Sequence, residues 1–238
     1  MAALRVCDVF KHKVWEMSSV KDLTAYNTKF CGKINKLMRL FFNQKNRHRL
    51  NNHDFSLLCN NCNGGIITHD LGEEFRSPTI NMFFTKDHFF RFCEDFDYYI
   101  TQPLVLCETP ITKPTFDYPV CNLDDLELHF MHYHSFEEAK DRWEIRSARL
   151  NYDNLFVMWT FFDKTDPRLL ERFERLPIKN KVAFTEEEFP NFPSAFCIKG
   201  YKDGLGNLAL FDNFIGRRKI DQFDYVTWFN SGIIKRME

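Results

Sequence analysis

Short apolar runs alternate with helix-type segments along this chain, and that alternation restricts its fold more than any other feature. Strand-like runs occur at residues 55–59, 79–84, 104–107, 118–121, 126–130, 155–161, 182–185 and 195–198. Helical periodicity occupies residues 20–49, 86–100, 136–150, 166–176 and 221–229. Strands and helices in alternation are typical of α/β proteins. We therefore predict a three-layer α/β sandwich with one mixed, mainly parallel sheet.

Capping residues mark two of the helix starts. Ser135 followed three positions later by Glu138 forms a capping box, and Asp166 precedes Pro167, which is favoured at the first helical position. Because no repeat or linker divides the chain, we predict one α/β domain over residues 51–238. A helical extension over residues 1–50 is expected to pack on it.

The first predicted helix, residues 20–49, is amphipathic. Its apolar positions recur at helical spacing, at Leu23, Tyr26, Phe30, Ile34, Leu37, Leu40 and Phe41. Lys and Arg fill the opposite face. The simplest interpretation is that the apolar stripe packs on the domain. Peripheral contact with a membrane surface is the alternative.

Charge and hydropathy exclude several partners. The 238 residues carry a formal net charge of −1, so no long-range field would gather nucleic acid. No apolar run reaches the roughly 18 residues of a membrane-spanning helix, and the N-terminus lacks the residue order of a signal peptide. We expect a cytoplasmic protein, with the inner face of the membrane as an alternative location. Its 8 cysteines are expected to be free thiols.

The segment Cys-Asn-Asn-Cys-Asn-Gly-Gly that follows the first predicted strand holds the strongest candidates for chemistry. Open α/β sheets bind ligands at the carboxyl ends of their strands. Cys62 is a candidate nucleophile if a neighbouring His or cation lowers its pKa. Asn60 and Asn61 can offer amide donors to an oxyanion, while Gly64 and Gly65 permit close approach to the backbone. The alternative is a simple bend with one buried thiol.

Two metal sites are alternative interpretations. Cys59 and Cys62 have the spacing of half a zinc site, whose other half would come from the histidines of one segment: His129, His132 and His134. Asp124 and Asp125 resemble the acidic pair with which many glycosyltransferases hold a divalent metal on a nucleotide sugar. The same two carboxylates could equally form a polar turn.

One face of the predicted helix 136–150 is basic. Arg142, Arg146 and Arg149 lie on it at i, i+4 and i+7. Guanidinium groups so arranged could hold a phosphate or carboxylate. Polar residues that follow the helix could complete the ligand site: Asn151, Asp153 and Asn154. The arginines could equally pair with acidic side chains of their own helix.

An ordered series of motifs runs from about residue 55 to residue 230. It includes Cys59-Asn-Asn-Cys62-x-Gly64-Gly65, Asp70-Leu-Gly72, Ser77-Pro-Thr-Ile-Asn-Met-Phe-Phe84, Arg149-Leu-Asn-Tyr-Asp-Asn154 and Phe223-Asp-Tyr-Val-Thr-Trp228. The series resembles a bacterial family known as a domain of unknown function, numbered 1919 and often labelled as exopolysaccharide biosynthesis proteins. We count Asp70 and Ser77, which lie in these motifs, among the ligand-binding candidates.

The resemblance also separates the two cysteines of the first motif. Family members often carry Ser at the position of Cys59, whereas the position of Cys62 stays Cys, which favours Cys62 acting alone. They often carry Trp where Asn63 stands here, so this chain departs from the pattern at one wall of the site.

The function that the resemblance implies is that of a transferase acting on a surface-polysaccharide precursor, in exopolysaccharide, capsule or O-antigen biosynthesis. In the preferred interpretation an acyl group passes from a coenzyme A thioester to a saccharide or lipid-linked saccharide. Cys62 would be the nucleophile or lie at the oxyanion position, His132 or His134 the general base, and Arg146 with Arg149 would hold a donor phosphate. The turn is also similar in form to that of coenzyme A-dependent capsule acetyltransferases.

Two further interpretations remain open at this point. One is a glycosyl- or phospho-sugar transferase that uses a nucleotide sugar with a divalent metal on Asp124 and Asp125. The other is a non-catalytic partner in the assembly machinery. The sequence leaves the oligomeric state undetermined.

Overall fold

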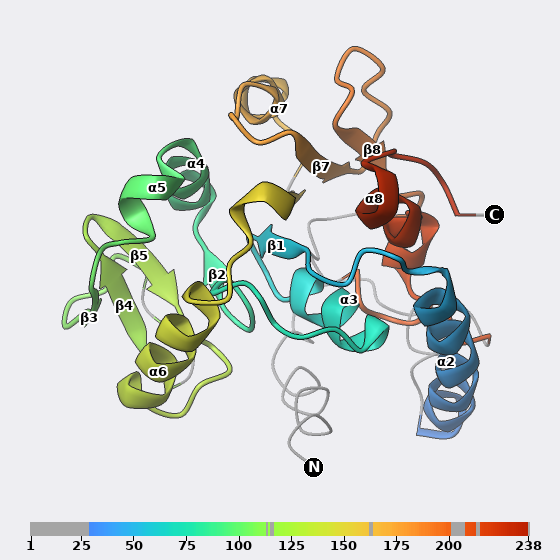
Figure 1. Cartoon of the computed structure of the whole chain (residues 1–238), viewed down its shortest axis with the longest axis horizontal. Coiled ribbons are helices and arrows are strands. Elements are labelled where there is room, and N and C mark those ends of the chain that lie inside the picture. Colours follow the sequence, from blue (N-terminus) through green and yellow to red (C-terminus); the bar gives the residue numbers. More distant parts are fainter. Residues whose placement is uncertain are drawn as a thin grey trace.

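The computed structural model describes residues 29–112, 114, 117–161, 164–200, 208–212 and 215–237. Within these residues the strands form two separate four-stranded sheets (Figure 1). The first sheet is parallel, with the order β1-β6-β7-β8, and the second is antiparallel, with the order β2-β5-β4-β3. The predicted α/β class is confirmed. The prediction of one mixed sheet is corrected to two sheets of different kinds.

The parallel sheet consists of β1 (Ser56–Cys59), β6 (Leu155–Thr160), β7 (Asn180–Thr185) and β8 (Ala195–Cys197). The helix α7 (Pro167–Glu174) connects β6 to β7. It begins as the Asp166-Pro167 pair predicts, since the Asp166 side chain accepts a hydrogen bond from the Arg168 backbone N–H. β1 lies at one edge of this sheet, so its carboxyl end is accessible to the second sheet.

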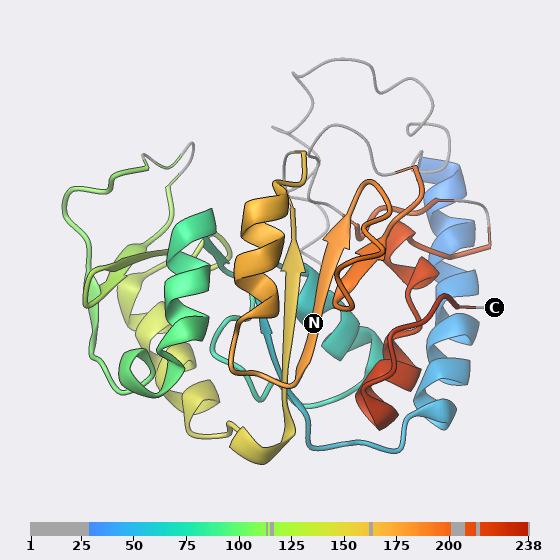
Figure 2. The same cartoon turned by 90° about the horizontal axis from the view of Figure 1, so that it is seen from above.

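Alternate side chains of the parallel strands enter two different cores, because successive residues of a strand point to opposite faces. Leu58 and Trp159 share one core with α4 (Lys86–Glu94) and α7. Leu57 and Met158 share the other with α3 (Asn63–Leu71) and α8 (Tyr225–Ser231). Helices therefore pack on both faces of the parallel sheet (Figure 2).

The antiparallel sheet consists of β2 (Phe83–Phe84), β3 (Leu104–Leu106), β4 (Val120–Leu123) and β5 (Leu126–His129). Asp124 and Asp125 connect β4 to β5, and so short a connection can join only antiparallel strands. Asp124 has a φ of 54°, in the left-handed region that tight hairpin turns require. The turn thus makes β4 and β5 antiparallel neighbours in the second sheet.

Helices α5 (Phe96–Tyr99) and α6 (Phe136–Ser147) share a hydrophobic core with the antiparallel sheet. Short 3-10 turns occur at η2 (Tyr152–Asn154) and η3 (Lys219–Gln222). Helix α6 starts at the predicted cap, where the Ser135 hydroxyl accepts from the Glu138 backbone N–H. The predicted helix 86–100 is divided into α4 and α5 at Asp95, whose φ and ψ of −128° and 52° are not helical.

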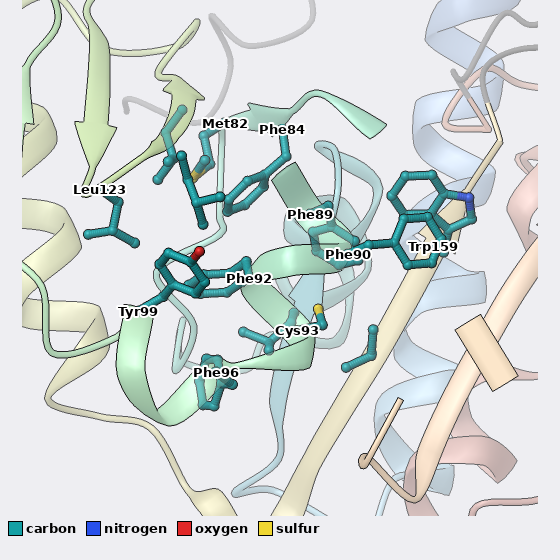
Figure 3. Close-up of a cluster of buried hydrophobic side chains, with 14 of the residues drawn as sticks. Met82, Phe84, Phe89, Phe90, Phe92, Cys93, Phe96, Tyr99, Leu123 and Trp159 are labelled. Atoms are coloured by element: carbon teal, nitrogen blue, oxygen red, sulfur yellow. The ribbon is translucent and has the colours of Figure 1, made fainter. Parts of the chain in front are cut away.

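An aromatic cluster joins the two sheets (Figure 3). Phe89 and Phe90 of α4 pack on Trp159 of β6, with ring centroids 5.3 Å and 4.6 Å apart. Phe92 of the same helix lies 5.2 Å from Phe84 of β2. Many of the 27 phenylalanines serve cores of this kind. The packing fixes the antiparallel sheet against β1 and β6, and with it the loop that follows β5.

Helix α2 (Lys29–Arg49) occupies the second part of the predicted helix 20–49, and residues 20–28 lie outside the described part of the chain. Its buried side chains are polar: Asn35, Arg39, Asn43 and Asn46. Its apolar side chains at positions 34, 37, 40 and 41 are exposed. The expectation that the apolar stripe packs on the domain is therefore wrong for these residues. Ion pairs of Arg39 with Asp70 and Asp221 hold the opposite face instead.

Candidate functional site

Cys62 follows the carboxyl end of β1 and is the N-cap residue of α3. The expected turn is therefore the first turn of a helix, in which the Ile66 N–H donates to the Cys62 carbonyl at 3.1 Å. Gly64 and Gly65 are helical rather than part of a loop. A Cβ atom on Gly64 would lie 2.8 Å from Cys59 Cβ, so glycine lets the helix begin directly against the strand.

The Cys62 thiol contacts a histidine from the other sheet. Its Sγ atom lies 3.2 Å from Nε2 of His132, in the loop after β5, and both side chains are half-buried. At the same junction the Phe84 N–H of β2 donates to the Asn60 carbonyl at 3.2 Å. The pair thus spans the meeting point of the two sheets, and it has the nucleophile-to-base distance that thiol–imidazole catalysis requires.

The protonation states of this pair follow from burial. Burial, together with the neighbouring Cys59, raises the pKa of the Cys62 thiol to about 12. Burial also lowers the pKa of His132 below its ordinary value of 6.5. The expectation that a neighbouring His or cation lowers the Cys62 pKa is therefore wrong, and near neutral pH the pair consists of a thiol and a neutral imidazole. Such a pair suits removal of the thiol proton during attack on a substrate, with the N-terminus of α3 favouring the negative charge that develops.

Asn60 and Asn61 have different surroundings. Both amide atoms of Asn60 bond to the backbone of Thr160: Nδ2 donates to its carbonyl at 3.0 Å, and Oδ1 accepts from its N–H at 2.9 Å. Asn60 therefore extends the β1–β6 pairing and is not positioned to polarise a substrate. The Asn61 Oδ1 atom accepts from the Asn63 N–H at 2.9 Å, whereas its buried Nδ2 has no hydrogen-bond partner among the described residues. Nδ2 is thus the available donor beside Cys62.

Arg146 of α6 is connected to the histidine loop. Its side chain is 8% exposed, and no carboxylate within the described part of the chain pairs with it. Its Nη1 donates to the Ile80 carbonyl at 3.2 Å and to the hydroxyl of Tyr133, the residue after His132. A buried guanidinium without a carboxylate partner is suited to hold an anionic group of a ligand.

Four other ligand-binding candidates lie away from Cys62. Arg149, Asn151, Asp153 and Asn154 precede β6 at its amino end, whereas Cys62 follows β1 at its carboxyl end, and the two strands run parallel. Arg149 pairs with Glu74 at 3.3 Å. The amides of Asn151 and Asn154 donate to Asp54 at 3.0 Å and 2.6 Å. The prediction that these residues share a site with Cys62 is therefore corrected by the direction of the strands.

Asp70, Ser77 and His134 also have other surroundings. Asp70 lies at the far end of α3, where Arg39 and Arg218 bind its carboxylate at 2.8 Å and 2.7 Å. The Ser77 hydroxyl lies 3.1 Å from the Thr79 hydroxyl, which in turn accepts from the Cys59 N–H. The His134 side chain is exposed, and its backbone N–H donates to Glu138. Of the two histidines considered as bases, the structure brings His132 to the thiol.

The residues of the two metal alternatives have protein partners. Tyr98 and Tyr99 donate to Asp124 and Asp125 at 2.8 Å and 3.0 Å, and Arg91 pairs with Asp125. His129 bonds to Glu127 through Nε2 at 2.9 Å and to the Tyr118 hydroxyl through Nδ1 at 3.1 Å, so both of its ring nitrogens have protein partners. Among the described residues, no group of three His, Cys, Asp or Glu side chains is arranged to hold a metal ion. The nucleotide-sugar interpretation stays a prediction.

Sequence reasoning missed Tyr133, Asn81 and the hydrogen bond from the Asn63 N–H to Asn61 Oδ1 at the start of α3. Asn81 has a φ of 62°, which asparagine tolerates better than most residues, and its Oδ1 would lie 3.4 Å from a Cβ on Gly65. The adjacent Gly64 and Gly65 were the sequence signal for this close packing. Two glycines permit a helix to start against both β1 and the loop that leads to β2.

The fold and the site together define an α/β protein with a Cys–His pair at the junction of a parallel and an antiparallel sheet. Residues 33–230 match the family described as a domain of unknown function (DUF1919), and the chain belongs to this family. A protein of Haemophilus influenzae, named "Uncharacterized protein", is 41% identical over 199 residues, which are 83% of this chain and 94% of that protein. Family membership is thereby confirmed, while the association with exopolysaccharide synthesis stays a prediction.

Proposed function

We propose that this protein is an acyltransferase in which Cys62 is the nucleophile and His132 the general base. The observation that carries the proposal is the 3.2 Å contact between Cys62 Sγ and His132 Nε2 at the N-terminus of α3. The donor would be a thioester such as an acyl coenzyme A. The acceptor would be a hydroxyl group of a saccharide or lipid-linked saccharide, the class that the family resemblance suggests.

The reaction has two half-reactions. In the first, Cys62 Sγ attacks the donor carbonyl as its proton moves to His132 Nε2, and the bond from the carbonyl carbon to the donor sulfur breaks. His132 returns the proton to the leaving thiolate. In the second, His132 takes the proton of the acceptor hydroxyl, whose oxygen attacks the Cys62 thioester. An ester forms, and Cys62 regains a proton from His132.

Two neighbouring groups would assist these steps. The amide of Asn61 and the backbone N–H groups at the start of α3 would donate to the oxyanion that forms on the carbonyl oxygen. The guanidinium of Arg146 would hold an anionic part of the donor or acceptor, because it has no carboxylate partner in the described part of the chain.

Covalent acylation of Cys62 tests the proposal. The full chain is incubated with acetyl coenzyme A and, separately, with the activated ester p-nitrophenyl acetate, and analysed by intact-protein and peptide mass spectrometry. We expect one acetyl group on Cys62. Cys107→Ala, which removes another half-buried thiol, should be acetylated like the wild type. An unmodified wild type with both reagents, or equal acetylation of Cys62→Ala, contradicts the proposal.

Ligand-dependent thermal stability separates the other interpretations. Stabilisation by coenzyme A without an effect of nucleotide sugars supports acyl transfer. Stabilisation by a nucleotide sugar with Mn²⁺ supports the sugar transferase. If neither ligand stabilises the protein and cells with Cys62→Ala make unchanged polysaccharide, a non-catalytic role is the remaining interpretation.

A further inference from the structure

An apolar stripe on α2 faces solvent. The side chains of Leu37, Leu40 and Phe41 are 57%, 65% and 67% exposed, and those of Ile34 and Met38 are 40% and 37% exposed. Four of the five positions follow the i, i+3, i+4, i+7 spacing of one helix face. α2 runs along the outer edge of the molecule in both views (Figures 1 and 2). Contiguous exposed apolar surface of this kind marks an interaction site.

The charge of α2 is of one sign. Its 21 residues contain neither Asp nor Glu, and they contain Lys and Arg at seven positions, 29, 33, 36, 39, 45, 47 and 49, of which Arg39 faces the domain in ion pairs. Because the whole chain has a net charge of −1, this positive charge is a local property of the helix. A helix with an apolar stripe and flanking basic residues has the composition of helices that lie in a membrane interface.

The stripe leads into a basic pocket at the C-terminal end of α2. Lys45, one turn beyond Phe41, lines a pocket of about 160 Å³ together with Arg49, Arg217 and Lys235. One carboxylate, Asp224, also lines it, and it pairs with Arg49 at 2.6 Å and Lys235 at 3.6 Å. Lys45, Arg49 and Lys235 outnumber this one carboxylate, and such a basic lining suits a phosphate group.

We propose that α2 docks the protein on a membrane surface containing anionic lipid. The stripe of Ile34, Leu37, Met38 and Phe41 enters the boundary between headgroups and acyl chains, and a lipid headgroup phosphate occupies the basic pocket. The proposal is independent of the proposed acyl transfer. No helix in the described ranges combines the length and hydropathy of a membrane span.

Charge favours lipid over the other occupants of this face. A symmetric contact between two copies would place one basic α2 against another, because the same patch meets itself across a two-fold axis. Residues 1–28 carry four Lys or Arg and three Asp or Glu, so they offer no negative complement. An anionic membrane supplies both the apolar environment and the opposite charge.

Vesicle co-sedimentation of the full chain tests the proposal. We expect binding to vesicles of equimolar phosphatidylcholine and phosphatidylglycerol and little binding to phosphatidylcholine alone. The double variant L37E/F41E should lose binding, whereas Ile145→Glu on the exposed face of α6 should bind like the wild type. The pocket variant K45E/K235E should bind at least about 25-fold more weakly, at about fivefold for each positive charge removed. Lys140→Glu is its control.

Several results would overturn the proposal. One is a wild type that binds neither kind of vesicle, as expected if residues 1–28 cover the stripe. Another is unchanged binding of L37E/F41E when its circular dichroism and thermal midpoint match those of the wild type. A third is a wild-type dimer in light scattering that L37E/F41E makes monomeric, without vesicle binding. A fourth is stabilisation by inorganic phosphate without vesicle binding, which indicates a site for a soluble anion.

Discussion

The two ends of α3 carry buried polar clusters of opposite character. At the C-terminal end, the Asp70 carboxylate accepts from Arg39, Arg218 and the Asn43 amide, which uses most of its hydrogen-bonding capacity. At the N-terminal end, the Cys62 thiol meets a neutral imidazole, and the nearby Asn61 Nδ2 has no partner among the described residues. A polar cluster whose donors and acceptors all have partners stabilises a fold, whereas a cluster with a donor left unpaired can bind a ligand.

Protonation sharpens the same contrast. Burial alone would raise the pKa of Asp70, but the contact with His69 at 3.7 Å and the charges of Arg218 and Arg39 hold this pKa well below its ordinary value of 3.8. Asp70 is therefore a fixed charge. Burial shifts the pKa values of Cys62 and His132 so that both side chains are uncharged near neutral pH. About 12 Å of helix separate the fixed charge from the proton-transfer pair.

The largest expected effect is that of Cys62→Ala on acyl transfer. Loss of the nucleophile should reduce the rate of acetylation by acetyl coenzyme A at least about 10⁴-fold, which is about 5.5 kcal/mol of activation free energy. The free energy of unfolding should change by less than about 1 kcal/mol, because a half-buried side chain loses one atom. Rapid-quench mass spectrometry and urea denaturation measure the two quantities. A large loss of stability with an unchanged rate of acetylation would show that Cys62, at the N-terminal end of α3, stabilises the fold and is not the nucleophile.

Asp70→Asn should have the opposite outcome. We expect the free energy of unfolding at pH 7 to fall by about 3–5 kcal/mol, because Arg39 and Arg218 lose a buried counter-charge. The rate of acylation per folded molecule should stay within about twofold of the wild type. Asp153→Asn, at an exposed position, serves as the matched control in urea denaturation. A loss below about 1 kcal/mol would mean that Asp70 is not what holds α2 to α3.

The stability supplied by Asp70 should depend on pH with a defined sign. Its folded-state pKa is lowered, so its contribution is fully present above the ordinary value of 3.8 and is lost as pH falls toward the folded-state pKa. The difference in unfolding free energy between wild type and Asp70→Asn should therefore be constant from neutral pH down to about pH 5 and should shrink below pH 3.8. A difference that grows on acidification contradicts the ion-pair assignment.

His132→Ala should reduce the rate of Cys62 acylation about 100-fold, or about 2.7 kcal/mol, with little change in stability. In the wild type His132 must be neutral to accept the thiol proton, and its pKa lies below 6.5. The rate should thus be flat above pH 6.5 and fall on acidification below it. His134→Ala is the matched control two positions away. A rate that keeps rising tenfold per pH unit between pH 7 and pH 9 would instead indicate direct reaction of a thiolate without a base.

The strands, the helix starts and Cys62 could be predicted because each depends on local signals. Apolar runs mark β1 and β6. Ser135 caps α6, and Asp166 caps α7. The partner of Cys62 could not be predicted with the same certainty. His132 and His134 differ by two positions, and the packing of the antiparallel sheet decides which of them reaches the thiol.

The face of α2 that packs on the domain could not be predicted, because a different physical term decides it. Periodicity assigns the apolar face to the core, which holds when burial of apolar area dominates. Here Arg39 finds Asp70 and Asp221, which lie far from it in the sequence, and these ion pairs turn the polar face inward. The separation of Asn151 and Asn154 from Cys62 could not be predicted either. It follows from the parallel pairing of β1 and β6, and strand direction is a property of the whole sheet.

The smallest expected effect is that of a substitution at Gly64, which lies at the N-terminal end of α3, close to Cys62. A Cβ at Gly64 would lie 2.8 Å from Cys59 Cβ, so Gly64→Ala must shift α3 away from β1. We expect a loss of about 1–3 kcal/mol in unfolding free energy and a further drop in acylation rate, because Cys62 moves relative to His132 while Asp70 keeps its partners. The matched control is Gly32→Ala on α2, where a Cβ meets nothing within 4 Å. That substitution should stabilise the protein by about 0.5–1 kcal/mol, because alanine favours helix. Equal effects of the two substitutions would show that close contact at Gly64 does not position Cys62.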